Sequence, residues 1–411
     1  MEKISVTIIG GGAAGLFAAA SLHNSVGKVV LLERGERVGR KLSATGNGQG
    51  NVSNTAVCKD RYFSVQKTDG GDRALARALE TYGVASMQSF FENLGVLLQA
   101  DERGRVYPYS KQASSLTDAL RFFVENRGVK VCLKTLVERV EKRGDEFYIA
   151  CKTESGTMEY LAENVLLCTG GKAAKNFGTD GLGYSIAKGL GHSLTATYPS
   201  LVQLKCDTKY TKTLKGIRAG DVGVTAFVDG KAVKTLFGDV IFTDYGVSGD
   251  AIFRLSAFLT ASFDKKITIE IDFMPNVEER ALLAFLSAKK SRLNPKDGEL
   301  LCGVLNNQIA RAVEKYCTGG SVEKIAKAVK KFPLEVTGNL GYDYAQVTKG
   351  GVPLIEVDEN FQSKKTPSLY FAGEILDIDG ECGGFNLHFA YASAKTVVAA
   401  IEKNCKRRGQ V

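Results

Sequence analysis

Three glycines and one acid near the N-terminus have the spacing of a nucleotide-binding turn. An apolar segment, residues 4–9, leads into Gly10, Gly12 and Gly15 in a Gly-x-Gly-x-x-Gly pattern. In such a pattern Gly10 permits a tight turn, Gly12 lets the backbone approach a pyrophosphate, and Gly15 lets the next helix pack closely. Glu33 ends a second apolar strand, where an acid accepts hydrogen bonds from an adenosine ribose. The pattern predicts a dinucleotide site, and Glu33 argues against an NADP-type 2′-phosphate there.

The helix after the turn is expected to bind phosphate at its N-terminus. Residues 13–22 are small and apolar on nearly every face, as in a helix buried under a sheet. Ala14 lies in its first turn, where N–H groups and the positive end of the helix dipole face an anion. We therefore count Ala14 among the predicted cofactor contacts.

The segment after Glu33 favours FAD over NAD. A basic run is followed by glycines separated by small polar residues, which suits a backbone pressed against a ribityl–pyrophosphate chain. The alternative is a solvated charged loop. No second Gly-x-Gly-x-x-Gly follows, so NAD(P)H is expected only as a transient electron donor. The predicted cofactor contacts in this segment are Arg34, Arg40, Lys41, Thr45, Gly46 and Asn47.

Two later strands are expected to end beside the same cofactor. Residues 165–168 and 369–371 are apolar, and each run leads into a glycine turn, through Thr169 or Ala372. Ligands of parallel sheets bind at the carboxyl ends of strands, so segments far apart in the sequence can hold one long cofactor. The residues expected there are Thr169, Gly170, Gly171, Gly373 and Glu374.

A glycine turn near the C-terminus carries the candidates for chemistry at the flavin ring. Gly384, Asn386 and Leu387 open an apolar helix whose N-terminus would stabilise negative charge on the N1–C2=O edge of reduced flavin. Proton donors for substrate reduction are sought among His388, Tyr245 and Tyr391, with Cys382 a weaker candidate. A histidine on an apolar helix is also often a packing residue.

Composition limits the other kinds of site and partner that this protein could have. The 411 residues carry a formal net charge of +9, with nine cysteines placed singly and three histidines, so we expect no metal site and no flavin–disulfide relay. We expect neither a signal peptide nor a membrane span, and hence a cytoplasmic protein. Lys and Arg are spread along the chain and do not form clusters with interleaved aromatic residues, so no nucleic-acid partner is expected. The oligomeric state is left open.

The pattern of elements predicts an α/β fold with an insertion. It consists of a Rossmann-like FAD-binding domain and an inserted module, which is part antiparallel barrel or sandwich and part helical. The expected bounds are 1–195 with 345–411, 196–275 and 276–344. Within them we expect paired strands at 129–133 and 135–140, a hairpin at Asp229-Gly230, an alternating strand at 267–273, and helices at 278–289, 300–316 and 322–331.

These motifs together resemble the HI0933-like flavoproteins, which include 3-dehydro-bile-acid Δ4,6-reductases and aminoacetone oxidases. The resemblance spans essentially the whole chain, through residues 10–15, 39–48, 169–171, 242–249, 347–352 and 372–387. It implies FAD, a Rossmann-like FAD-binding domain with an inserted antiparallel β-barrel and a small helical subdomain, and a backbone contact from Val137 to the adenine. Two departures lie near the expected reaction centre: Gln49-Gly50 replaces the family's Arg-Cys pair, and His388-Phe389 replaces its Gln-Trp or Gln-Ala.

The preferred function is an FAD-dependent oxidoreductase that reduces a C=C bond conjugated to a ketone, as in a steroid or bile acid. Flavin N5 would deliver hydride to the β-carbon while an acid protonates the α-carbon or the oxygen. The first alternative is an amine oxidase that produces hydrogen peroxide. A further alternative is a flavin-containing nucleic-acid-binding protein.

Overall fold

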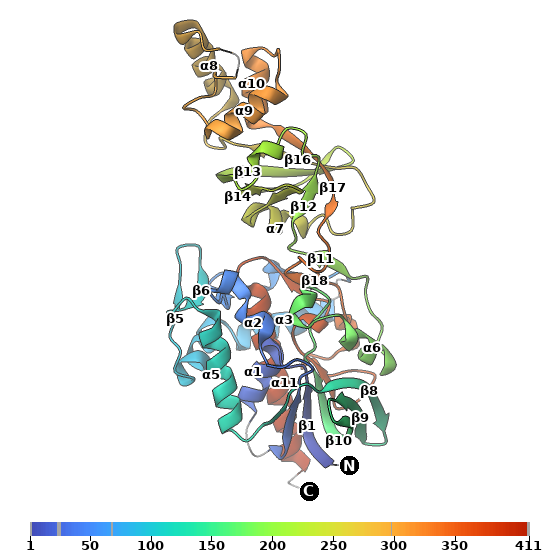
Figure 1. Ribbon diagram of the computed structural model, residues 1–411. Coiled ribbons are helices and arrows are strands. Elements are labelled where there is room, and N and C mark those ends of the chain that lie inside the picture. Colours follow the sequence, from blue (N-terminus) through green and yellow to red (C-terminus); the bar gives the residue numbers. More distant parts are fainter. Residues whose placement is uncertain (1, 23–25, 67–68, 297, 409–411) are drawn as a thin grey trace. The chain divides into compact units, whose positions relative to one another are not determined.

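The protein packs into two compact units, each with its own hydrophobic core. The computed structural model describes residues 2–22, 26–66, 69–296 and 298–408. Unit 1 comprises Met1–Tyr198 and Val347–Val411, and unit 2 comprises Pro199–Gln346 (Figure 1). The chain leaves unit 1 at β11 (Tyr198–Ser200) and returns at β18 (Val347–Lys349).

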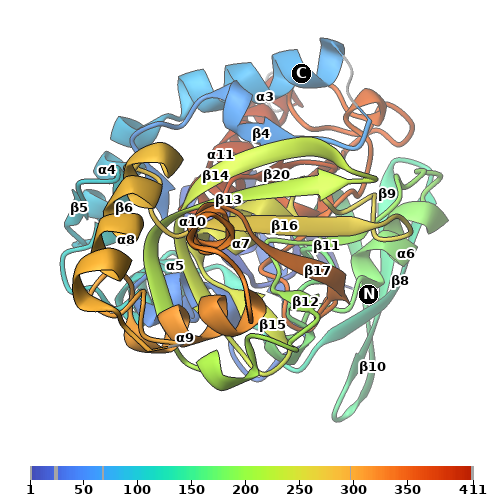
Figure 2. The same cartoon turned by 90° about the horizontal axis from the view of Figure 1, so that it is seen from above.

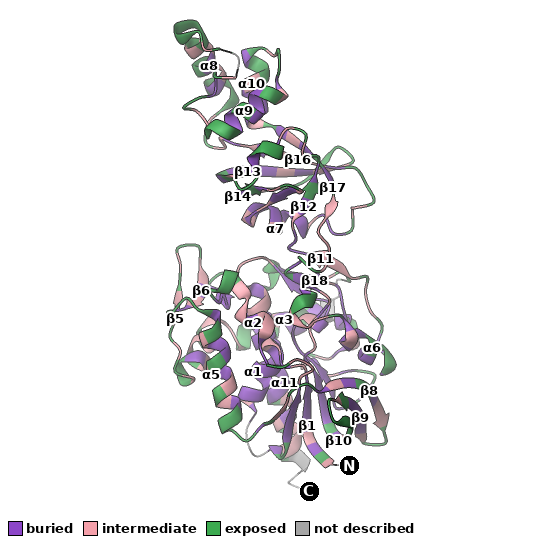
Figure 3. Ribbon diagram, viewed as in Figure 1, coloured by how far each residue is buried: buried purple, intermediate pink, exposed green. Residues whose placement is uncertain are grey.

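Unit 1 is built on a 7-stranded sheet in the order β7-β2-β1-β10-β9-β8, with β19 also paired to β10. β2 is wholly apolar, and β1 and β10 are buried in the halves that lead to their carboxyl ends, as expected for a sheet covered on both faces (Figure 3). β1 pairs in parallel with β2 and β10, while β9 and β8 add an antiparallel edge. The strands are β1 (Glu2–Ile9), β2 (Val29–Leu32), β7 (Lys130–Cys132), β8 (Leu136–Arg143), β9 (Glu146–Thr153), β10 (Gly156–Leu167) and β19 (Leu369–Phe371).

The pairing predicted for residues 129–133 and 135–140 was wrong. β7 extends the parallel sheet beside β2, whereas β8 pairs with β9. The two strands are close in sequence, but β7 places Lys130 opposite Val30 of β2 and so extends the parallel βαβ sheet. β8 is then free to form a hairpin with the next strand.

Helices flank the sheet, and the first of them is almost wholly buried. α1 is apolar around its circumference and packs against α11 and α5 (Figure 1). Unit 1 contains α1 (Ala13–Ser21), α2 (Arg40–Ser43), α3 (Asp69–Thr81), α4 (Val84–Asn93), α5 (Ala113–Asn126), α6 (Leu182–Gly189) and α11 (Phe385–Arg408). Two small sheets complete it: β3 (Ser53–Asn54) with β6 (Arg105–Pro108) and β5 (Leu98–Ala100), and β4 (Tyr62–Phe63) with β20 (Asp379–Gly380).

Unit 2 contains the predicted barrel, closed in the order β12-β15-β14-β13-β16-β17. The expected hairpin turns at Asp229-Gly230, and the alternating segment forms β16 (Figure 2). Two glycines of the 242–249 motif lie where backbone segments of the barrel approach one another closely. A Cβ on Gly246 would lie 2.4 Å from Leu204 O, and one on Gly249 would lie 2.3 Å from Asp239 O. This motif therefore has a folding role.

The barrel and the helices of unit 2 share one core. The last strand of the barrel, β17, lies within residues 276–344, which were predicted to form a helical subdomain. The strands are β12 (Leu204–Cys206), β13 (Arg218–Val228), β14 (Lys231–Phe242), β15 (Gly246–Ser248), β16 (Ile267–Asp272) and β17 (Phe332–Asn339). The helices are α7 (Asp250–Ser256), α8 (Glu279–Leu293), α9 (Asn307–Tyr316) and α10 (Val322–Lys330), so α9 begins later than expected, at a side-chain cap from Asn306. Within the described ranges, no helix has the length and apolar character needed to cross a bilayer.

Candidate active site

The parallel strands of unit 1 bring four distant segments to one edge of the sheet. The register places Ile9 beside both Leu32 and Leu167, and Leu167 beside Phe371. The residues that follow these strand ends therefore meet, although they lie more than 300 positions apart in the sequence. They are Gly10, Glu33, the Thr169–Gly171 turn and the Gly373–Glu374 pair.

The three motif glycines have separate physical roles. Gly10 has φ +104°, and a Cβ there would lie 2.6 Å from Cys168 O, so it fits the tight turn. A Cβ on Gly15 would lie 2.0 Å from Gly10 O, so only glycine lets α1 pack against the turn. At Gly12 no atom beyond the neighbouring residues of the chain lies within 4 Å of the Cβ position, and no side chain caps the N-terminus of α1. An open cradle at an uncapped helix N-terminus fits the pyrophosphate of a dinucleotide.

Glu33 is held at the edge of this cradle. Its carboxylate accepts hydrogen bonds from the Gly11 N–H at 2.8 Å and the Gly35 N–H at 2.6 Å. Thr135 N–H donates to the Glu33 carbonyl, which brings the start of β8 and its Val137 alongside. The acid predicted to bind ribose and the backbone predicted to contact adenine thus lie on neighbouring segments.

The predicted basic contacts occupy different positions. The ammonium group of Lys41 forms an ion pair with the Glu374 carboxylate at 2.7 Å, so it lies at the strand ends. Arg34 pairs with Asp180 at 2.7 Å, and Arg40 donates to Asn176 O at 2.8 Å. The two arginines therefore bind the loop after β10, leaving Lys41 as the predicted cation held at the strand ends.

The glycine-rich segment after α2 has the unusual backbone its composition suggested. Gly46 and Asn47 are left-handed, at φ 58° and 54°. The Thr45 hydroxyl donates to the Leu42 carbonyl at 2.7 Å, which uses its proton within the loop. This bond fixes the start of the loop and leaves its exposed backbone to approach a ligand.

Thr348 is a site residue that the sequence analysis did not single out. Its hydroxyl accepts hydrogen bonds from Lys172 N–H at 2.7 Å and Ala173 N–H at 2.9 Å, and its own N–H donates to Glu374 at 2.8 Å. A Cβ on Gly171 would lie 2.4 Å from that hydroxyl. Thr348 therefore ties the turn after β10 to Glu374. The sequence signal for Thr348 is the motif at residues 347–352, which is part of the family resemblance but carried no predicted role.

The turn before α11 is held from both sides. Gly384 has φ +99°, and a Cβ there would lie 2.1 Å from Ser53 O. The Asn386 side chain bonds both the N–H and the carbonyl of Gly380, so it closes the turn itself. Leu387 is half-buried. Gly373 packs at the other end of the site, because its Cβ would lie 2.9 Å from Cβ of Ala14.

His388 and Tyr391 point into the packed interior of unit 1. The His388 side chain is buried, its Nδ1 lies 2.8 Å from the Ser53 hydroxyl, and burial lowers its pKa to about 4. Tyr391 packs against Phe17 and bonds Ser86 through its hydroxyl, and burial raises its pKa to about 12. Buried groups with these pKa values are poor proton donors to a bound substrate, so the contacts favour a packing role for both.

The third predicted proton donor lies in unit 2. Tyr245 is half-buried between β14 and β15, and burial raises its pKa. Cys382 is half-buried in the turn before α11. Among the described residues, no group of three or more His, Cys, Asp or Glu could hold a metal ion.

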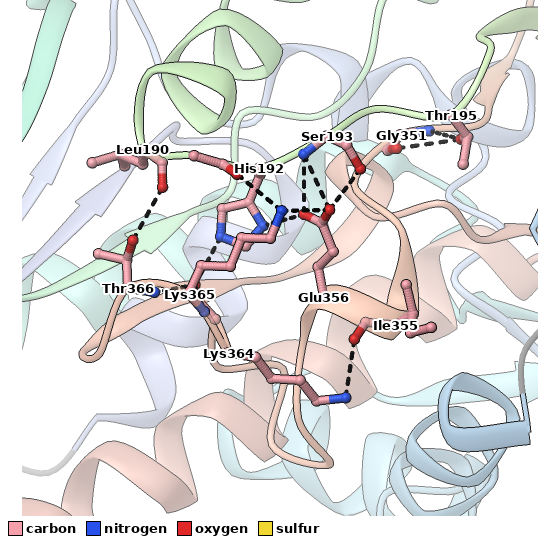
Figure 4. A network of polar contacts seen from close by, with 12 residues as sticks. Leu190, His192, Ser193, Thr195, Gly351, Ile355, Glu356, Lys364, Lys365 and Thr366 are labelled. Carbon is pink, nitrogen blue, oxygen red and sulfur yellow. Dashed lines mark hydrogen bonds and ion pairs between the residues drawn. The ribbon is translucent and has the colours of Figure 1, made fainter.

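A second polar cluster in unit 1 has the alignment of a hydrolase triad (Figure 4). His192 Nε2 lies 2.7 Å from the Ser363 hydroxyl, and its Nδ1 lies 2.8 Å from Glu356. The Ser363 oxygen, however, already accepts the N–H groups of Lys365 and Thr366, and the residue is buried. A nucleophile needs a free lone pair and an open approach. The cluster is therefore a clamp between the end of α6 and the loop before β19.

Burial and hydrogen bonding set the direction of the pKa shifts in this clamp. Burial lowers the pKa of His192, and its bond to Glu356 opposes that change. Burial alone would raise the pKa of Glu356, but hydrogen bonds from Lys365 and Ser193 outweigh it and bring the pKa to about 2. Glu356 is thus ionised and His192 neutral at neutral pH.

Comparison with known proteins agrees with this arrangement. The family described as HI0933-like protein, Rossmann domain, matches residues 4–400. The chain belongs to this family. Membership confirms the predicted Rossmann-type fold and makes the protein an FAD-dependent oxidoreductase, in agreement with the open cradle at Gly12.

Relatives of this HI0933-like protein carry two different names. A Clostridium scindens protein named 3-dehydro-bile acid delta(4,6)-reductase is 32% identical over 406 residues, covering 94% of this chain and 96% of that one. A Haemophilus influenzae protein named ribosomal RNA dihydrouridine synthase is 28% identical, covering 96% and 98%. A protein of the same name from Escherichia coli is 26% identical, covering 96% and 97%.

Solved structures share the fold at low identity. A 3-ketosteroid delta1-dehydrogenase from Sterolibacterium denitrificans gives a TM-score of 0.52 at 14% identity, covering 98% of this chain and 100% of that one. A flavocytochrome c3 fumarate reductase also gives 0.52 at 14% identity, covering 98% and 79%. At this level of identity the likeness concerns the fold alone.

Proposed function

We propose that this protein reduces a C=C bond conjugated to a carbonyl group, with NAD(P)H as electron donor. The overall reaction takes one hydride from NAD(P)H and one proton, and yields the saturated carbonyl compound and NAD(P)⁺. The observation that carries the proposal is the 32% identity, along nearly the whole of both chains, to a protein named as a reductase of 3-dehydro-bile acids. A steroid-like enone is the first substrate class proposed.

The residues of unit 1 would bind and orient the cofactor. FAD, when bound, supplies the hydride chemistry. Gly12 and the N-terminus of α1 would hold its pyrophosphate, and Glu33 would bind the adenosine ribose. Lys41, paired with Glu374, would place a positive charge at the strand ends. The N-terminus of α11 would stabilise negative charge through its dipole.

Uridine in RNA is a second candidate substrate. Two relatives that match nearly the whole chain are named ribosomal RNA dihydrouridine synthase. The bond saturated in making dihydrouridine, C5=C6 of uracil, is conjugated to the C4 carbonyl. It therefore belongs to the same reaction class as the enone, and one flavin site can serve either substrate.

An anaerobic titration tests the proposal. NADH or NADPH should bleach the flavin absorbance, and a steroid enone or a uridine-containing RNA should restore it. Bleaching by an amine, with hydrogen peroxide formed on admitting air, would instead support the amine oxidase alternative and refute the reductase.

A further inference from the structure

The small sheet β3-β6-β5 of unit 1 presents two tyrosines and an arginine on one side. Along β6 the side chains alternate, so Val106 and Pro108 are buried while Arg105 and Tyr107 are half-exposed. Tyr109 continues the Arg105–Tyr107 side and is 70% exposed.

The neighbouring strand widens this surface. Gln99 lies opposite Tyr107 in the antiparallel register, so both side chains share a face. Tyr109 N–H donates to the Leu97 carbonyl, which places Leu97 beside it, and Leu97 is 65% exposed. We call this surface the tyrosine face. It comprises Leu97, Gln99, Arg105, Tyr107 and Tyr109.

Basic groups lie along the tyrosine face. Arg103 and Lys111 are exposed at the two ends of the β6 segment. Arg105 lies 6.0 Å from the centre of the Tyr107 ring, and its Nε donates to Asp101 at 2.8 Å. The Asp101 carboxylate also accepts the N–H groups of Arg103 and Arg105, so it fixes the turn and the arginine. The expectation of no nucleic-acid partner overlooked this cluster, in which basic and aromatic residues alternate along residues 103–111.

The tyrosine face borders the turn that opens α11. Asn54 of β3 lies opposite Arg105 in the register, and its Nδ2 donates to the Gly383 carbonyl at 3.1 Å. Gly383 has φ +113°, and a Cβ there would lie 3.7 Å from Cγ of Arg105. The surface is therefore continuous with the turn expected at the flavin edge.

We propose that the tyrosine face binds a single-stranded segment of RNA next to the uracil to be reduced. Tyr107 and Tyr109 would stack on bases, and Arg103, Arg105 and Lys111 would lie near phosphates. Aromatic side chains on a sheet, combined with nearby cations, are how many proteins hold single-stranded nucleic acid without reading its sequence. The proposal rests on uridine as the substrate of the proposed function.

Binding of an oligonucleotide tests this directly. The full-length protein is titrated into a fluorescein-labelled oligouridine of about 12 nucleotides, a length that covers one such surface, and anisotropy is recorded. Tyr107→Ala and Tyr109→Ala should each weaken binding roughly 5- to 150-fold, as expected for the loss of one stacked base. Lys111→Gln should lower the slope of log affinity against log salt by about 0.7.

Phe122→Ala is the matched control. Phe122 is also an exposed aromatic residue beside an arginine, at 4.4 Å from Arg121, but it lies on α5. Its removal should leave RNA binding unchanged. Thermal melting of every variant checks that the fold is kept.

The outcomes separate this proposal from the proposed function. Reduction of cyclohexenone by the wild-type protein with NADPH reports the flavin chemistry without RNA. If the enone is reduced but both tyrosine variants bind oligouridine like the wild type, the tyrosine face is refuted and the reductase stands. Absence of oligouridine binding by the wild type at low salt also refutes it. Failure to reduce either an enone or uridine refutes the proposed function instead.

Discussion

Replacing Gly12 with valine should abolish tight FAD binding without harming the fold. No atom beyond the neighbouring residues of the chain lies within 4 Å of the Cβ position, and the backbone, at φ −76° and ψ −166°, is extended and suits a β-branched residue. The isopropyl group would instead fill the cradle in front of α1. The phosphate oxygens could then no longer reach the N–H groups at the helix N-terminus.

The expected loss of FAD affinity follows from the contacts that the phosphate loses. A hydrogen bond to a charged group contributes about 1.5–3 kcal/mol, and the helix dipole adds about 0.3–1 kcal/mol. Their loss amounts to about 2–4 kcal/mol, which corresponds to roughly 30- to 900-fold weaker FAD binding.

The assay is a titration of the apoprotein with FAD, followed by flavin fluorescence, together with a melting curve of the apoprotein. Gly189→Val in α6 is the matched control, since a Cβ at Gly189 also meets no atom within 4 Å beyond its chain neighbours and the backbone of its own helix. We expect both apoproteins to melt like the wild type and only Gly12→Val to lose affinity. A Gly12→Val protein that folds and binds FAD as tightly as the wild type would refute the placement of the pyrophosphate at α1.

Three further predictions concern stability and the buried histidine. Gly15→Ala should destabilise the apoprotein by about 1–3 kcal/mol in urea unfolding, because its Cβ would lie 2.0 Å from Gly10 O; an unchanged midpoint would contradict this. Glu356→Gln should cost about 1–2 kcal/mol at pH 7, less than the full pKa depression implies because solvent screens Lys365. Since the folded pKa is lowered from 4.5 to about 2, this advantage of the wild type should shrink as pH falls from 4.5 toward 2, and a constant difference would refute the assignment. His388→Gln should lower the melting temperature and leave the pH profile of kcat unchanged, whereas loss of one limb of the profile would restore His388 as a proton donor.

The sequence predicted the positions where only one residue type fits. Gly10 and Gly15 could be assigned from spacing alone, because their contacts are local and recur in every turn of this kind. Glu374 was found because a strand end marks it. The two glycines act through the backbone and Glu374 is marked by its place after a strand, so the pattern of residue types is enough to reveal them.

Residues that act through side-chain direction could not be placed in this way. His388 stands next to the turn in sequence, yet its side chain points toward Ser53 in the interior. Thr348 lies 176 positions from Lys172, and only the folded chain shows that its hydroxyl binds that backbone. The aromatic and basic residues of β6 similarly form a surface only when β5 is paired beside them. Such contacts depend on rotamers and register, which one sequence does not contain.

The late return of the chain to unit 1 has a consequence for biosynthesis. β19 pairs with residues that emerged from the ribosome some two hundred positions earlier. Until it arrives, the part of β10 that it will cover presents an unpaired strand edge, which invites association with other nascent chains. All of unit 2 must be translated in the meantime. The predicted cofactor site, which includes Gly373 and Glu374 just after β19, is therefore incomplete until unit 2 and β19 have both been synthesised.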